Sequence, residues 1–265
     1  SGLNNNAYTN VMVVWLMRTA LDFLDLLSDT RKKELFTDLG LDDDEVARWK
    51  NICRNMFVPF FDNGILSQFE GYENLEEIDF EYYQQKYGDI HRLDRILKAE
   101  GDNPNRYKIS KQADVLMLFY LLSAEELEAL FKCMGYSFDR SIIPETVKFY
   151  LDRSSHGSTL SRLVFSWVFS RTDREESYHV FKEALKSDYE DIQGGTTSEG
   201  IHLGSMAGTV DMIQRCYTGL EIRGGILWIN PQLPKEIKGF NMRIRYRGHW
   251  IWLHFTQSKV EVSFE

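Results

Sequence analysis

The spacing of apolar residues changes from a helical to a strand period after Tyr217, and this change constrains the fold more than any other feature of the sequence. From Asn10 to Leu27, apolar side chains recur at steps of three and four residues, which is the period of a helix that packs on a core. Similar patterns predict further helices at 31–39, 42–56, 111–122, 124–134, 143–151, 160–170, 174–187 and 201–217. Beyond Tyr217, apolar and polar residues alternate, which predicts strands at 225–229, 240–246, 250–255 and 259–264.

This order of segments predicts a mainly α chain that ends in a small antiparallel β-sheet domain. Short loops between consecutive helices favour antiparallel neighbours, so we expect a helical bundle or toroid rather than a doubly wound sheet. The helical domain is expected to span residues 1–216 and the sheet domain residues 217–265. Residues 57–110 form a long irregular insert, with short helices near 76–87 and 90–98, and inserts of this length usually serve a function.

Charge, apolar runs and cysteine usage exclude several classes of function. The chain has 31 Lys and Arg against 40 Asp and Glu, a net charge of −9, so we expect no nucleic-acid partner. Its longest apolar runs, Val11–Met17 and Val115–Leu122, are much shorter than the roughly 18 to 20 residues of a membrane-spanning helix. The three cysteines form no CxxC pair, and the first residues of this sequence show no succession of basic, apolar and small residues as in a secretory signal. We therefore expect a cytoplasmic protein with no metal site.

Two glycine- and hydroxyl-rich segments precede predicted helices and are candidate anion sites. Residues 191–204 combine glycines, whose amides can turn toward one point, with Thr and Ser hydroxyls and the start of a helix. Glu199 and His202 are three residues apart, so they share a helical face and could act together on a proton or a phosphate. Residues 153–161 repeat this composition around His156. Two ordinary loops whose hydroxyls cap helices are the alternative.

Two further segments have the composition of a sugar site. In Gln68-Phe69-Glu70-Gly71-Tyr72, amide and carboxylate groups alternate with aromatic rings, and sugars need both polar partners and flat apolar surfaces. Lys111 and Gln112, which open a predicted helix, are a second candidate pair. The alternatives are an aromatic loop that packs in the core and a helix start that faces solvent.

Taken together, five motifs resemble glycoside hydrolase family 65, which holds inverting phosphorylases of maltose, trehalose and kojibiose, and some hydrolases. They occur in the family's order, at residues 4–10, 68–72, 111–114, 155–161 and 197–204. The resemblance implies a β-sandwich, a linker, an (α/α)6 barrel and a C-terminal sheet domain. This chain resembles only the C-terminal portion, which is part of the barrel and the sheet. Residues 155–161 and 191–197 look closest to enzymes that act on trehalose.

The resemblance implies that the chain is a fragment of a phosphorylase that cleaves trehalose or maltose with inversion. In such a reaction an acid protonates the glycosidic oxygen, and inorganic phosphate attacks to give glucose 1-phosphate. Phosphate is thus a co-substrate, and no other cofactor is implied. The implied phosphate contacts are Gly157, Ser158, Thr159 and His202, with His156 beside them. The implied sugar contacts are Glu70, Lys111 and Gln112, followed by Gln68 and Phe69.

The family's general-acid glutamate lies just before the stretch that matches residues 4–10, so we expect the isolated chain to be inactive. An inverting α-glucosidase such as a trehalase, with Glu199 as its base, is one alternative function. A non-catalytic carbohydrate-binding remnant is the other. Helices that lack their barrel neighbours would expose apolar surface, so we expect a homo-oligomer or association with the missing N-terminal part.

Overall fold

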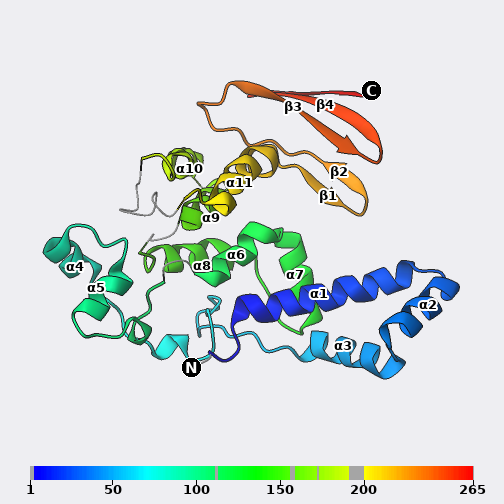
Figure 1. Ribbon diagram of the computed structural model, residues 1–265, viewed down its shortest axis with the longest axis horizontal. Coiled ribbons are helices and arrows are strands. Elements are labelled where there is room, and N and C mark those ends of the chain that lie inside the picture. The colour runs from blue at the N-terminus through cyan, green and yellow to red at the C-terminus, as the bar shows by residue number, and fades with distance from the viewer. Residues whose placement is uncertain (1–2, 111–112, 156–158, 172, 191–199, 265) are drawn as a thin grey trace. The chain divides into compact units, whose positions relative to one another are not determined.

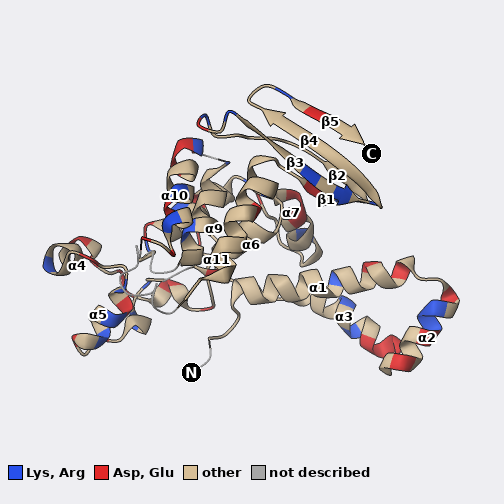
Figure 2. Cartoon of the chain, turned by 45° about the horizontal axis from the view of Figure 1, so that its top comes forward, with Lys and Arg blue, Asp and Glu red and all other residues tan. Residues whose placement is uncertain are grey.

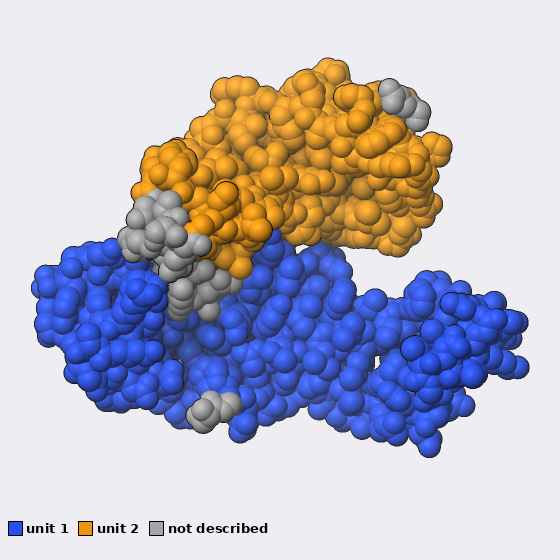
Figure 3. All heavy atoms as spheres, in the orientation of Figure 1, with its two compact units in different colours: residues 1–155 blue, residues 156–265 orange. Residues whose placement is uncertain are grey.

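The computed structural model describes residues 3–110, 113–155, 159–171, 173–190 and 200–264 (Figure 1). The chain divides into two compact units, residues 1–155 and 156–265, which are coloured separately in Figure 3. The first unit contains helices and irregular segments, and the second combines helices with two small sheets. The predicted order of a mainly helical chain followed by antiparallel strands is therefore confirmed. Among the helices of the described ranges, none is long and apolar enough to cross a bilayer.

A long helix, α1 (Ala7–Leu26), supports the first unit. Asn6 caps its start, because the Asn6 side chain accepts a hydrogen bond from the amide of Thr9 at 2.9 Å. The helices α2 (Asp29–Leu39) and α3 (Asp43–Asn55) follow, and α1 packs on α3, α6 and α7. The Asp42 side chain caps α3 by accepting a hydrogen bond from the amide of Glu45, and Figure 2 shows the acidic residues that follow it in the first turn. They face the positive end of the helix dipole.

The irregular insert forms two short helices, α4 (Phe80–Tyr87) and α5 (Leu93–Ala99), close to the predicted positions. Single 3-10 turns at Tyr72–Asn74 and Pro104–Arg106 bend the rest of the insert. The insert also contributes to the core of the first unit. Its fully buried apolar side chains are Val58, Leu66, Tyr72, Leu93 and Leu97.

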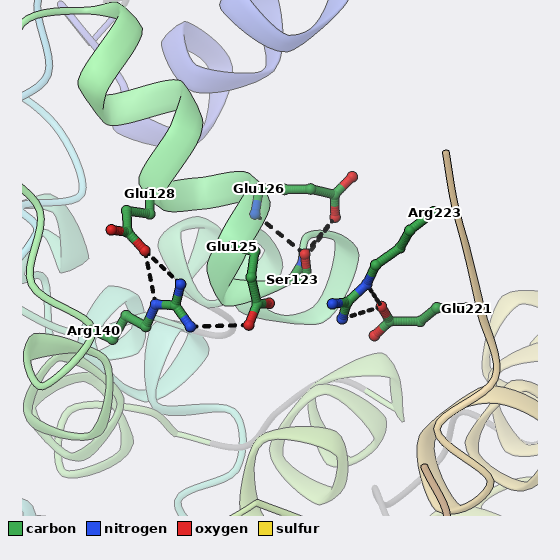
Figure 4. A network of polar contacts seen from close by, with 7 residues as sticks. All are labelled: Ser123, Glu125, Glu126, Glu128, Arg140, Glu221 and Arg223. Carbon is green, nitrogen blue, oxygen red and sulfur yellow. Dashed lines mark hydrogen bonds and ion pairs between the residues drawn. The ribbon is translucent and has the colours of Figure 1, made fainter. Parts of the chain in front are cut away.

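Three helices complete the first unit: α6 (Asp114–Leu121), α7 (Ala124–Cys133) and α8 (Ile142–Leu151). A capping box starts α7, in which Ser123 and Glu126 bond each other's backbone amides (Figure 4). Figure 4 also shows the guanidinium of Arg140 bonded to two carboxylates of α7, Glu125 and Glu128. These contacts join the start of α7 to the chain that follows it.

Three helices form a layer in the second unit: α9 (Thr159–Phe169), α10 (Arg174–Lys186) and α11 (Leu203–Asp211). The hydroxyls of Ser166 and Ser177 each donate to the other residue's carbonyl at 2.7 Å, which links α9 to α10. The predicted helix 201–217 is only partly regular, because its last turns, Met212–Tyr217, adopt a π-helix.

The strands of the second unit form a hairpin and a three-stranded meander. Strands β1 (Glu221–Arg223) and β2 (Ile226–Trp228) pair with each other, and β1 was not predicted. The meander has the order β3 (Gly239–Tyr246), β4 (His249–Thr256) and β5 (Val260–Phe264). Arg247 and Gly248 connect β3 to β4 with positive φ at both residues, as a tight hairpin turn requires.

Candidate functional site

In the first unit, the asparagine-rich start of the chain lies against the predicted sugar-binding segment. The amide of Ala7 donates to the carbonyl of Gln68 at 3.0 Å, and the amide of Glu70 donates to the carbonyl of Asn4 at 3.2 Å. The Asn5 side chain also donates to the Glu70 carboxylate at 2.8 Å. Two motifs more than 60 residues apart in the sequence therefore form one structural element, with Glu70 exposed at its edge.

The aromatic residues of this segment pack rather than present open rings. Phe69 meets Tyr72 edge to face at 5.2 Å between ring centroids, and Tyr72 is only 1% exposed. Burial raises the pKa of the Tyr72 hydroxyl above its ordinary value. Next to these rings, the buried Gln68 side-chain oxygen has no hydrogen-bond donor among the described residues. Gln68 therefore has a side-chain oxygen that can still accept a hydrogen bond, and Glu70 is exposed to solvent. Phe69 is half-buried and is chiefly a packing residue.

Glu77 forms an ion-pair cluster with Lys108 and Arg153, which precede the predicted motifs at 111–114 and 155–161. Arg153 bonds both oxygens of Glu77, at 3.0 and 3.1 Å, and Lys108 bonds the same carboxylate at 3.3 Å. Burial alone raises the pKa of Glu77, but the hydrogen bonds from Arg153 and Lys108 outweigh it and leave the pKa below its ordinary value. Close by, Ser110 exchanges backbone hydrogen bonds with Arg153 and Ser155, at 3.1 and 3.0 Å.

Several predicted site residues lie outside the described residues, so their geometry is not given. They are Lys111, Gln112, His156, Gly157, Ser158 and Glu199. The described members of the predicted phosphate site are Thr159, the first residue of α9, and His202, the N-cap residue of α11. Both belong to the second unit.

Helices α9 and α11 run parallel, so Thr159 and His202 lie at the same end of the helical layer. A Cβ on Gly208 would lie 2.5 Å from Leu163, which shows how closely the two helices approach. Further along α9, the ring of Trp167 lies under the guanidinium of Arg215 at 4.9 Å, and Arg215 belongs to the π-helix that continues α11. Beyond that, Cys216 lies 3.0 Å from the hydroxyl of Ser170. Because the residue numbers of the partners rise together, the two helices begin at one end and share the direction of their dipoles.

The imidazole of His202 is held by a carboxylate that the sequence did not reveal. Asp188, in the turn after α10, accepts hydrogen bonds from the His202 amide at 3.0 Å and from its ring Nδ1 at 2.7 Å. An ionised carboxylate only accepts, so Nδ1 carries the proton and Nε2 is the ring nitrogen left for a ligand. Asp188 comes 14 residues before His202, and no spacing pattern marks such a pair.

This end of the second unit has the chemistry of an anion site. Two helices present the positive ends of their dipoles, Thr159 adds a hydroxyl, and the Nε2 of His202 adds a ring nitrogen. A phosphate ion can accept hydrogen bonds from the amides at the helix starts and from the Thr159 hydroxyl, while the Nε2 of His202 can accept one from the P–OH group of hydrogen phosphate.

Comparisons with known families cover almost the whole chain. The profile described as glycosyl hydrolase family 65 central catalytic domain matches residues 1–211. The profile described as glycosyl hydrolase family 65, C-terminal domain, matches residues 220–265.

Similar curated proteins are much longer than this chain. An uncharacterized glycosyl hydrolase of Mycobacterium tuberculosis is 48% identical over all of this chain and 20% of its own length. A trehalose 6-phosphate phosphorylase of Lactococcus lactis is 37% identical over all of this chain and 32% of its own length. A kojibiose phosphorylase of Halothermothrix orenii is 28% identical over 99% of this chain. The chain therefore spans about a fifth to a third of the length of these relatives.

A solved structure named "Putative kojibiose phosphorylase from human microbiome" has the same fold over 99% of this chain and 34% of its own. The TM-score is 0.76 and the sequence identity is 23%. This likeness fits part of a helical barrel followed by a small sheet domain.

Proposed function

Because the chain belongs to glycosyl hydrolase family 65, we propose that it forms part of a glycoside phosphorylase. The proposed reaction cleaves an α-linked glucose disaccharide with inorganic phosphate and releases glucose 1-phosphate with inverted configuration. The observation that carries this proposal is the pair of parallel helix starts in the second unit, where Thr159 and the Asp188-held His202 can receive phosphate.

The chemistry of phosphorolysis explains why such a site is needed. An acid protonates the glycosidic oxygen, and phosphate attacks the anomeric carbon from the opposite face, so the protein itself supplies no nucleophile. The protein must instead hold a dianion close to the sugar and keep it oriented. In our proposal Thr159 and His202 do this together with Gly157, Ser158 and His156, and no further cofactor is needed.

We propose a disaccharide of the trehalose type as the substrate, with maltose as the second candidate. Two phosphorylases among the relatives are named for trehalose 6-phosphate and for trehalose, and others for kojibiose. The proposed sugar contacts are Glu70, Lys111 and Gln112, with Gln68 and Phe69 beside them. The hydrogen bond from Asn5 supports this role for Glu70, because it orients the exposed carboxylate.

We also propose that the 265 residues alone do not cleave a disaccharide. The family resemblance places the general acid before the stretch that matches residues 4–10, and we assign no carboxylate of this chain to that role. The cysteines of the described residues are free thiols, which fits the reducing cytoplasm as the proposed compartment.

Phosphate dependence tests the proposed function. The protein is expressed from its complete reading frame and incubated with trehalose, trehalose 6-phosphate, kojibiose or maltose, with and without inorganic phosphate. We expect β-glucose 1-phosphate, identified by NMR, only when phosphate is present. Free glucose formed in phosphate-free buffer would contradict the proposal and favour an inverting α-glucosidase with Glu199 as its base. Sugar binding without any turnover would favour the carbohydrate-binding alternative.

A substitution links the reaction to the site. We expect His202→Gln to raise the KM for phosphate about tenfold or more, because a hydrogen bond to a charged ligand is worth about 1.5–3 kcal/mol. His249→Gln on β4 is the matched control, since His249 is exposed and lies in the sheet rather than in the helical layer. Equal kinetics for the two variants would remove His202 from the phosphate site.

A further inference from the structure

Arg162 is a buried cation whose hydrogen-bonding capacity is only partly used. It lies on α9 one turn after Thr159, and its side chain is 8% exposed. Its Nε faces a carboxylate oxygen of Glu183 at 3.4 Å. Its buried Nη1, however, has no hydrogen-bond acceptor among the described residues. A buried guanidinium N–H without an acceptor is unfavourable, so Nη1 is available to an acceptor such as an oxygen of a bound ligand.

Ser205, on the neighbouring helix α11, is a second buried polar residue without a hydrogen-bond partner among the described residues. It lies in the first turn of α11, three residues after His202, and is 2% exposed. Its hydroxyl is buried and has no hydrogen-bond partner in the described part of the chain. A serine in the first turn of a helix normally finds a partner in its own backbone or in a neighbouring side chain. The unused hydroxyl is therefore a second group available to a ligand.

Both groups are at the end of the helical layer where His202 lies. Long side chains on a helix point toward its N-terminus, so Arg162 extends toward the start of α9. Its partner Glu183 lies near the end of α10, which runs antiparallel to α9 and ends where α9 begins. Since α9 and α11 are parallel, the first turn that holds Ser205 is at this same end.

We propose that Arg162 and Ser205 are additional ligands of the phosphate that Thr159 and His202 bind. This inference rests on the proposed function and adds a charged ligand to it. Thr159, His202 and the helix ends supply neutral hydrogen-bonding groups or partial charges, whereas Arg162 supplies a full positive charge. Its planar fork fits two oxygens of a phosphoryl dianion, and the competing carboxylate of Glu183 is 46% exposed and binds only the Nε side.

Calorimetric titration with inorganic phosphate at constant ionic strength tests this inference on the protein expressed from its complete reading frame. We expect Arg162→Met, which keeps the apolar stem but removes the charge, to weaken phosphate binding at least tenfold. Ser205→Ala is expected to weaken it about threefold, because one neutral hydrogen bond is lost. Arg162→Lys is expected to lie between the wild type and Arg162→Met, since it keeps the charge but loses the fork.

Glu183→Gln separates ligand binding from a structural role. It breaks the same ion pair from the other side, so a purely structural Arg162 predicts similar losses of phosphate affinity in both variants. We expect Glu183→Gln to bind phosphate as tightly as the wild type or more tightly. Thermal unfolding of each variant with and without phosphate provides a second readout. The rise in Tm caused by phosphate should be reduced in Arg162→Met and retained in Glu183→Gln.

The outcomes distinguish failure of this inference from failure of the proposed function. A wild-type protein that binds no phosphate overturns both. A wild type that binds phosphate, together with unchanged affinity in Arg162→Met and Arg162→Lys, overturns only the role of Arg162. A parallel titration with glucose 6-phosphate identifies the source of the phosphoryl group. Loss of glucose 6-phosphate binding alone in Arg162→Met would show that the residue receives a sugar phosphate, contrary to the proposal.

Discussion

At the scale of single residues, the most informative contact is the hydrogen bond from His202 to Asp188. The two bonds to Asp188 fix the backbone and the ring of His202 together, so the direction of Nε2 is set before a ligand arrives. A preoriented hydrogen-bonding group loses less entropy on binding than a free one. Asp188 is thus a positioning residue in the proposed phosphate site, and not itself a ligand.

We expect Asp188→Asn to raise the KM for phosphate about tenfold, because the amide no longer selects the tautomer with the proton on Nδ1. The KM for the disaccharide should change much less. Steady-state kinetics with each substrate varied in turn measure both values. Glu190→Gln, which removes an exposed carboxylate two residues away that pairs with Lys186, is the control and should leave both unchanged. Equal rises in the two KM values would indicate general distortion instead.

Glu77 gives the first unit a pH-dependent contribution to stability. Its pKa is lower in the folded chain than its ordinary value of 4.5, so the ionised form stabilises the fold above that pH. The contribution is lost as the pH falls through the folded pKa. Because the carboxylate is 54% exposed, we expect Glu77→Gln to cost only about 0.5 kcal/mol at pH 7. Urea unfolding at pH 7 and pH 3 should show this difference shrinking toward zero at the lower pH.

At the scale of elements, the close approach of α9 and α11 depends on a glycine. Gly208 lies in the middle of α11, against the buried side chain of Leu163. A Cβ at this position would lie 2.5 Å from the Cδ1 of Leu163, so any larger residue requires the Leu163 side chain or the two helices to shift. Their separation in turn controls how the proposed phosphate ligands at their first turns are spaced.

We expect Gly208→Ala to lower the free energy of unfolding by about 1 kcal/mol, because overpacking against Leu163 costs more than the gain in helix propensity. Gly204→Ala in the same helix is the matched control, since a Cβ there meets no atom within 4 Å. It should raise the free energy of unfolding by about 0.5–1 kcal/mol. Chemical denaturation measures both variants. A stabilising Gly208→Ala would mean that Leu163 repacks without cost.

At the scale of the whole molecule, α1 exposes a stripe of large apolar side chains. Leu16, Phe23 and Leu26 are 62, 55 and 83% exposed, and their spacing places them on one face of the helix. An uncovered apolar stripe of this kind favours association with another protein surface. It is consistent with our expectation that the chain forms a homo-oligomer or binds a preceding part of a longer protein.

We expect the 265-residue polypeptide to self-associate, as measured by light scattering across a range of concentrations. Phe23→Glu combined with Leu26→Lys should shift the population toward the monomer, because both changes place charge on the stripe. Leu39→Lys, at an exposed position on α2, is the control and should leave the association unchanged. A monodisperse wild-type monomer would contradict the prediction.

Much of this protein is determined locally in its sequence. The helices around Val14 and Phe181 and the strands around Ile244 and Leu253 were predicted from periodicity alone, because the repeat of buried positions follows from local backbone geometry. Caps such as Asp42 are equally local, since they act on amides three residues away. The irregular π turns at Met212–Tyr217 and the short strand Glu221–Arg223 were missed because neither has a pattern long enough to read.

The tertiary structure alone decided which of these segments meet. Nothing in the sequence near Glu70 points to Asn5, 65 residues away, and nothing near His202 points to Asp188. The burial of Arg162 was equally invisible, because a charged residue in an amphipathic helix is expected to face solvent. Hydrogen bonds between distant residues depend on how helices pack, and packing is set by the shapes of many side chains at once. The sequence therefore determined the elements and the family, and the structure determined how the candidate ligands are arranged.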